Sequence, residues 1–104
     1  MTVEIDVLNS LKEVYDPEIP LNIVDLGLVK GIHVKDNNLE VVMTLTTPKC
    51  PLEKYIKNTI IRHLRKDFPQ FEDISIQLDF SQPWTTKDIS PEGLQRLREL
   101  GWNV

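Results

Sequence analysis

Apolar and polar side chains alternate without a break from Ile74 to Ser81. Successive side chains of a strand point to opposite faces, so this pattern predicts a strand with one dry face and one wet face. A sheet built from such strands has only one face to bury, and helices must cover it. This segment constrains the fold more than any other, because it predicts a two-layer domain with helices on one side of a sheet.

Five other segments supply the remaining elements. Residues 29–34 and 39–46 carry strand patterns, and Lys35-Asp36-Asn37-Asn38 between them is typical of a tight hairpin. The connection from Thr46 to Ile74 is long enough for a crossover with a helix. Apolar residues at helical spacing predict helices over 3–15, 51–66 and 90–100. The expected fold is α+β in the order α-β-β-α-β-α, two-layered, with helices packed on one face of a three-stranded mixed sheet.

The size and composition of the chain limit the kind of site it can build. Its 104 residues are enough for one domain, which we expect to span residues 1–104. No apolar run approaches the ~18–20 residues of a membrane span, and the N-terminus lacks a signal-peptide pattern. We therefore expect a cytoplasmic protein without a membrane partner. A domain of this size has little room for an internal cavity, so we expect a shallow site made of loops and helix ends.

Charge is unevenly distributed along the chain. The net charge of −4 argues against general binding to nucleic acid or anionic membranes. Residues 1–25 hold six acidic residues against one lysine, whereas residues 49–66 hold six basic residues against one glutamate. The basic stretch has two interpretations: a solvated helix face, or a docking surface for an acidic partner.

The single cysteine, Cys50, is the most informative candidate for chemistry. It lies between Pro48 and Pro51, beside Lys49, at the expected start of a helix. A helix N-terminus and a neighbouring cation both favour the thiolate, which is the form that attacks electrophiles and binds metals. A buried, purely structural cysteine is the alternative. One cysteine allows no internal disulfide and cannot by itself hold an iron–sulfur cluster, which usually takes four.

Four further residues join Cys50 as candidates. Asp16 and Glu18 flank Pro17 in a stiff loop, where their carboxylates can serve as proton acceptors or hard metal ligands; the alternatives are a helix or turn cap and a solvated side chain. Thr46 and Thr47 end the strand that leads to the cysteine, and their hydroxyls can bond a ligand or simply cap. We expect structural roles for the remaining polar and aromatic candidates, namely Asp25, His33, His63 and Trp84.

Two motifs resemble a known family. Asp16-Pro17-Glu18-Ile19-Pro20 followed by residues 22–29, and the run from Met43 to Pro51, are similar to signatures of the iron–sulfur cluster assembly domains that include SufT, PaaD and eukaryotic cytosolic assembly factors. The resemblance implies a small α/β domain that helps mature iron–sulfur proteins. It implies a SufT-like rather than a PaaD-like role, because PaaD-type members carry additional C-terminal cysteines. The implied site residues are Asp16, Glu18, Thr46, Thr47 and Cys50.

The residues and the resemblance together predict an assembly or maturation factor that contacts clusters or client apoproteins through Cys50, the one metal ligand we expect. A cluster would be bound transiently and not permanently, with a homodimer or small thiols completing its ligands. The expected partners are the iron–sulfur assembly machinery or client apoproteins. Two alternatives stay open: a thiol enzyme with Cys50 as nucleophile and Asp16 or Glu18 as base, and a pure adaptor that docks through its basic helix.

Overall fold

A computed structural model of the chain describes residues 3–16, 19–46 and 52–103. Its elements follow the expected order, with one short 3-10 helix added before the last helix. The fold class is therefore confirmed as α+β with a mixed sheet. The elements are α1 (Val3–Leu11), β1 (Val29–Lys35), β2 (Asn38–Met43), α2 (Glu53–Asp67), β3 (Asp73–Leu78), η1 (Thr86–Asp88) and α3 (Pro91–Glu99).

The sheet has the strand order β1-β2-β3. Strands β1 and β2 form the expected hairpin, in which Asp36 takes a left-handed conformation with φ of 54°. Strands β2 and β3 are parallel, with Leu39 opposite Ile74 and Met43 opposite Leu78. The chain returns to this parallel register through α2, because parallel neighbours require a crossover.

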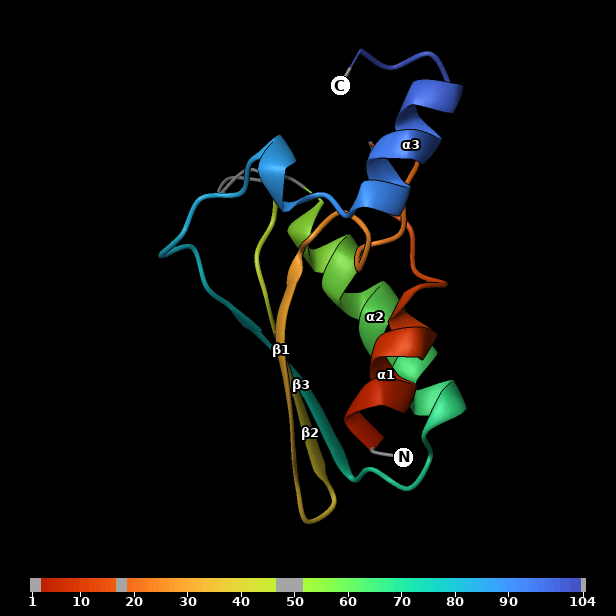
Figure 1. Cartoon of the computed structure of the whole chain (residues 1–104). Helices are drawn as coiled ribbons and strands as arrows, with labels where there is room; N and C mark the ends of the chain where they lie inside the picture. The colour runs from red at the N-terminus through yellow and green to blue at the C-terminus, as the bar shows by residue number, and fades with distance from the viewer. Residues whose placement is uncertain (1–2, 17–18, 47–51, 104) are drawn as a thin grey trace.

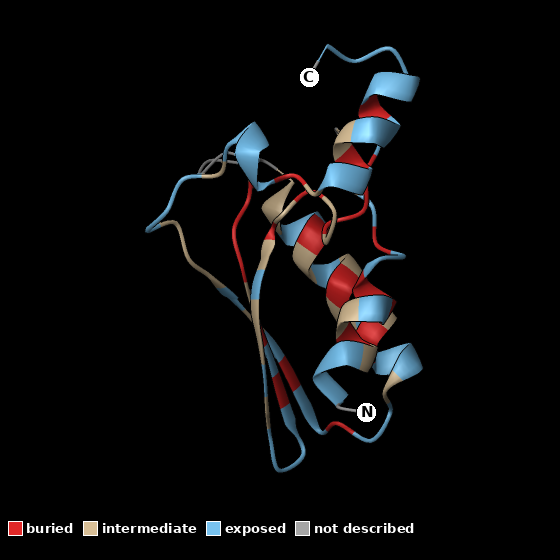
Figure 2. Ribbon diagram, viewed as in Figure 1, coloured by how far each residue is buried: buried red, intermediate tan, exposed pale blue. Residues whose placement is uncertain are grey.

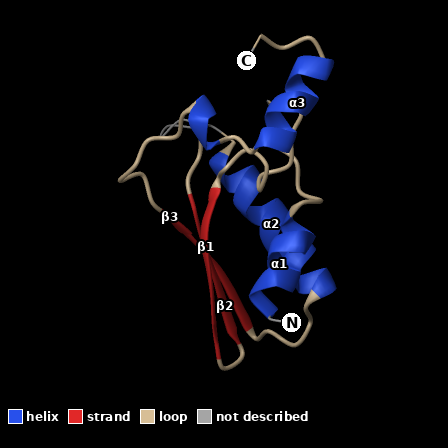
Figure 3. Cartoon of the chain, in the orientation of Figure 1, coloured by secondary structure: helices blue, strands red, loops and turns tan. Residues whose placement is uncertain are grey.

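The helices α1 and α2 cover one face of the sheet, and the other face is open (Figure 3). Leu39, Val41 and Met43 on β2 point into the helical layer and are at most 1% exposed. Figure 2 shows buried residues concentrated where the helices face the strands. The period-two pattern of β2 and the helical pattern of α2 therefore meet in one apolar core, to which α2 contributes Ile56, Ile60 and Leu64.

Several element ends differ from the sequence prediction. Helix α1 stops at Leu11 instead of Tyr15, because the chain turns at residues 12–14 and Tyr15 then bridges to Asn22. Tyr15 is 61% exposed, so it does not belong to the apolar face of the helix. Strand β2 ends at Met43 rather than at Thr46, although the Thr44 amide still donates to Leu28 O, the residue just before β1.

Helix α3 packs against a loop and not against the sheet. Ser90 caps it by accepting from the Gly93 amide, and Pro91 occupies its first turn. Gly93 is buried against Leu21 and the carbonyl of Asp25, so α3 lies beyond the end of the sheet, above α2 in Figure 1. Gly101 ends the helix region with φ of 95°, as the sequence predicts. No helix among the described residues is both long and apolar enough to cross a membrane.

Candidate functional site

A tightly bonded loop lies at the end of the sheet where β1 begins and β2 finishes (Figure 1). We call its described residues, 14–16 and 19–28, the sheet-end loop. Its backbone closes on itself: the Asp16 amide donates to Leu21 O at 3.0 Å, the Ile23 amide to Val14 O at 2.9 Å and the Leu28 amide to Ile23 O at 3.0 Å. Four of its leucine and isoleucine side chains (Leu21, Ile23, Leu26 and Leu28) are at most 3% exposed. The loop is therefore part of the core and not a surface excursion.

Asp25 joins the sheet-end loop to α3. Its amide donates to Asn22 Oδ1 at 2.8 Å, and its Oδ2 accepts from Asn22 Nδ2 at 2.8 Å. Its Oδ1 accepts from the Ser90 hydroxyl at 3.1 Å, while its carbonyl accepts from the Ser90 amide at 2.8 Å. The expectation that Asp25 forms a turn is thus met, and the same side chain also fixes the cap of α3.

Gly27 and Trp84 attach the segment after β3 to the same loop. Gly27 has φ of 79°, and a Cβ there would lie 2.1 Å from the carbonyl oxygen of Asp88. Trp84 is half-buried against the core, and its indole Nε1 donates to Leu26 O at 2.6 Å. This meets the expectation of a structural role for Trp84, and it adds a hydrogen bond that the sequence did not reveal.

Of the five predicted site residues, the structure describes Asp16 and Thr46. Asp16 is half-buried, and its Oδ1 accepts a hydrogen bond from the Ile19 amide at 2.9 Å. Thr46 is half-buried and follows the buried Leu45. Glu18, Thr47 and Cys50 lie outside the described residues. We expect the segment of Asp16 and Glu18 to lie near the segment from Thr46 to Cys50, and the Thr44 amide, which donates to Leu28 O at 2.8 Å, joins the described residues that flank them.

Helix α2 begins at this same end of the molecule (Figure 1). Its first residue is Glu53, three positions after Cys50 in the sequence, so the expected helix start at Pro51 is two positions early. Leu52 occupies the N-cap position and supplies no side-chain hydrogen bond to the first turn. The amides of that turn therefore keep the partial positive charge of a helix N-terminus, which stabilises a nearby anion.

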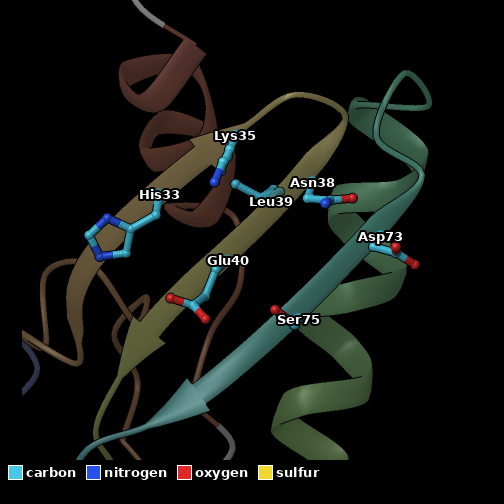
Figure 4. Close-up of a pocket in the computed structure, with 7 residues that line it drawn as sticks. All are labelled: His33, Lys35, Asn38, Leu39, Glu40, Asp73 and Ser75. Carbon is cyan, nitrogen blue, oxygen red and sulfur yellow. The ribbon is translucent and has the colours of Figure 1, made fainter.

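Among the described residues, three shallow hollows lie on the surface, one of them between α1 and β1, and the other two bear on the predicted site. One, of about 300 Å³, is beside the sheet-end loop and is lined by Tyr15, Pro20, Leu21, Asn22, Asp25 and Arg96. The other, of about 400 Å³, is on the open face of the sheet. Figure 4 shows its lining side chains, among them His33, Glu40 and Ser75. None of the predicted site residues lines this second hollow among those that the structure describes, whereas Tyr15, next to Asp16, lines the first.

The charged surface follows the sequence pattern. The exposed residues of α2 include Lys54, Arg62, Arg65 and Lys66, while Ile56, Ile60 and Leu64 face the core. Hydrogen bonds from the Ser81 side chain and amide, helped by the charge of Lys30, lower the pKa of the exposed Asp79 carboxyl below its ordinary value. This carboxylate closes a local turn after β3 and has no contact with the predicted site among the described residues.

One cluster of titratable side chains was not predicted from the sequence. Glu13, His63 and Asp67 come together where α1 ends against the C-terminal half of α2. His33 lies on the open sheet face opposite Glu40, whereas the imidazole of His63 has two carboxylates within 3.4 Å. The signal was the spacing of His63 and Asp67, four residues apart on one helix face.

Comparison with known proteins identifies the family. The model of the iron–sulfur cluster assembly protein family matches residues 4–78. An Fe-S protein maturation auxiliary factor from Porphyromonas gingivalis is 35% identical over 98 residues, covering 93% of this chain and 92% of that protein. The corresponding factor YitW from Bacillus subtilis is 33% identical over 82% of this chain and 83% of its own. The chain therefore belongs to the iron–sulfur cluster assembly protein family, as its motifs predicted.

The fold is found in a solved relative. The domain of unknown function DUF59 from Bacillus anthracis superposes with a TM-score of 0.87 and 28% identity over 91% of both chains. An iron–sulfur cluster carrier protein from Synechocystis is 27% identical over 74% of this chain, but the match spans only 22% of that larger protein. The same domain thus occurs both by itself and as a part of longer proteins.

Proposed function

We propose that Cys50 is the group through which this iron–sulfur cluster assembly factor contacts clusters or client apoproteins. The observation that carries the proposal is the start of α2, three positions after the lone cysteine in the sequence, where Leu52 at the N-cap position supplies no side-chain cap. Its amides favour a thiolate over a thiol. The names of the relatives, Fe-S protein maturation auxiliary factors, support maturation of iron–sulfur proteins as the purpose of that thiolate.

The ligand count favours transfer over storage. One chain supplies one thiolate, while a cluster usually takes four. A cluster would therefore be held weakly, as cargo, with a second copy of the chain or small thiols completing its ligands. Asp16 and Glu18 supply at most oxygen ligands, which bind less well than thiolates at a soft metal. Weak binding suits a protein whose product must leave.

The fixed sheet-end loop supports a role for Asp16 beside this thiolate. Its carboxylate is held by the Ile19 amide, and the loop is bonded to Thr44 at the strand end that leads to Thr46. We propose that Asp16, Glu18, Thr46 and Thr47 surround Cys50 and position the client or cluster. The location in the cytoplasm and the extent of the domain over residues 1–104 stay predictions.

A thiol enzyme is the second candidate, and it needs a base to activate the thiol. His33 is on the open sheet face, and His63 faces Glu13 and Asp67. These placements favour an assembly factor over a histidine-assisted thiol enzyme. The adaptor hypothesis retains the exposed basic residues of α2 as its surface.

Anaerobic reconstitution with iron and sulfide tests the proposal. Iron and sulfide are measured per chain, and the native mass is recorded. We expect substoichiometric, chelator-labile cluster in the wild type, none in Cys50→Ala, a smaller loss in Glu18→Ala, and no change in His33→Ala. Cluster retained in Cys50→Ala, or a stable four-iron cluster on a monomer without added thiol, would contradict it.

A further inference from the structure

Two carboxylates and an imidazole converge on one point between α1 and α2. His63 Nε2 lies 3.3 Å from Glu13 Oε2 and 3.4 Å from Asp67 Oδ2. All three atoms lie within 4.8 Å of one another. The side chains of His63 and Asp67 are 24% and 33% exposed, and that of Glu13 is 69% exposed. The cluster is thus half-enclosed, with one side open to solvent.

Helix geometry holds this arrangement in place. His63 and Asp67 are four residues apart on α2, so they share one face one turn apart. Helix α1 runs in the opposite direction beside it, since Ser10 meets Asp67 while Glu13, further along, meets His63. The Ser10 hydroxyl donates to Asp67 Oδ2 at 2.6 Å and orients that carboxylate. A hydrogen bond behind a ligand is the support that protein metal sites commonly use.

The imidazole nitrogen at the centre of the cluster has no hydrogen-bond partner among the described residues. His63 Nε2 is buried, and no described residue makes a hydrogen bond to it, because neither carboxylate contact has hydrogen-bond geometry. A lone pair on that nitrogen would face two anionic oxygens, which is unfavourable without a cation between them. Asp67 ends α2 and Ser10 lies in the last turn of α1, so the C-terminal dipoles of both helices add to the attraction for a cation.

The two distances from the His63 nitrogen match the spacing of ligands in a metal site. Ligand atoms about 2.0–2.1 Å from a metal at tetrahedral angles lie about 3.3–3.4 Å apart, which is the separation seen from His63 Nε2 to each carboxylate. We propose that Glu13, His63 and Asp67 bind one divalent transition-metal ion, with water in the remaining position. One nitrogen and two oxygens suit Zn²⁺ or Fe²⁺ and make this site chemically distinct from the soft Cys50 thiolate.

Zinc binding in a chain without its thiol tests the proposal. Cys50→Ala provides the background, so that the only cysteine contributes nothing. Equilibrium dialysis with Zn²⁺ alone at neutral pH should give one zinc per chain. Adding His63→Gln should lower the affinity on the order of tenfold or more, and Glu13→Gln should also lower it. The matched control is His33→Gln, which removes the other, exposed histidine and should change nothing.

Two further measurements keep the result interpretable. Far-ultraviolet circular dichroism checks that each variant folds. If His63→Gln does not fold, Glu13→Gln, which changes an exposed side chain, replaces it as the test variant. The ¹⁵N shift of the His63 imidazole should change at Nε2 when zinc is added. Equal zinc affinity in the His63 and His33 variants, or an Nε2 that stays protonated in the presence of zinc, would overturn the proposal and leave an imidazolium–carboxylate ion pair. Because Cys50 is absent throughout, failure here leaves the proposed cluster function untouched.

Discussion

The sheet-end loop and the open sheet face are both rich in polar groups, but they hold them differently. In the loop, Asp25 bonds Asn22 and Ser90, and Leu26 O receives the indole of Trp84. On the open face, His33, Glu40 and Ser75 are exposed strand positions around a shallow hollow. One region has its polar groups fixed by partners from distant parts of the chain, while the other presents them to water.

The two regions differ in how firmly they can hold the side chains of a site. A site needs side chains held within a fraction of an ångström, and only the loop has contacts from both α3 and the segment after β3. The open face supplies a scaffold whose outward side chains can change at little cost in stability. We therefore expect substitutions in the loop to be felt by the whole domain and matched substitutions elsewhere to be mild.

Removing the indole that packs on the sheet-end loop should have the largest effect. Trp84→Ala deletes a half-buried ring and leaves Leu26 O without its partner, and we expect a loss of about 3 kcal/mol in the free energy of unfolding. Trp84→Phe, which keeps most of the ring but not the donor, should lose about 1 kcal/mol. Trp102→Ala, at a ring that is 43% exposed, is the matched control. Urea denaturation measures the free energy of unfolding of all three variants. Equal losses in Trp84→Ala and Trp102→Ala would show that the contacts of the sheet-end loop contribute no more to stability than an exposed ring does.

Adding a methyl group at Gly27 should come next. The substitution Gly27→Ala puts a Cβ at φ of 79° and 2.1 Å from Asp88 O, so we expect it to cost about 2 kcal/mol. Gly101→Ala shares the positive φ but meets nothing within 4 Å, and should cost about 1 kcal/mol. Thermal unfolding of the two variants separates the strain of the backbone from the clash. Similar costs for both would mean that the segment around Asp88 moves away freely.

The serine that caps α3 should matter less. Ser90→Ala removes the acceptor for the Gly93 amide and the donor to Asp25, and we expect a loss of about 1 kcal/mol in the free energy of unfolding. Ser75→Ala, on the open face, should stay within about 0.5 kcal/mol of the wild type. A loss at Ser75 as large as that at Ser90 would show that the open face is more ordered than its exposure indicates.

The smallest effect is electrostatic. The Ser81 hydroxyl and amide, with Lys30 nearby, lower the pKa of the Asp79 carboxyl, so the stabilising contribution is present above the ordinary pKa and is lost as pH falls through the lowered one. A carboxyl-carbon NMR titration should place the Asp79 midpoint below 3.8, and Ser81→Ala should raise it. An Asp79 midpoint that Ser81→Ala leaves unchanged would assign the shift to another cause.

The spacing of apolar residues and the residue types at the turns were enough to predict most of the architecture. The alternation in β2 and β3 and the helical spacing in α2 correctly gave the layers, because burial on one face is what these patterns encode. They misplaced the end of α1, since Tyr15 looked like one more core position. In the structure it leaves the helix to bridge Asn22, a tertiary contact that local spacing cannot reveal.

The residue types of the candidate site could be predicted from the sequence, but the contacts that hold the surrounding loop could not. Cys50 and the Asp16 loop stand out by residue type and by the two prolines beside each, which are local features. Contacts such as Trp84 to Leu26 O, or Ser90 to Asp25, join residues about sixty positions apart and require the fold. Only part of the Glu13–His63–Asp67 cluster could be recognised in the sequence, because His63 and Asp67 are four residues apart on one helix while Glu13 comes from a distant segment.

The pH dependence of Cys50 alkylation in the folded protein tests directly whether Cys50 is an accessible thiolate. Since the start of α2 and Lys49 favour the thiolate, the midpoint should fall below the ~8.5 of a free cysteine, with rapid labelling at neutral pH. Labelling that appears only on unfolding would show that Cys50 is a buried structural residue. A midpoint at or above the pKa of a free cysteine would contradict the proposed thiolate.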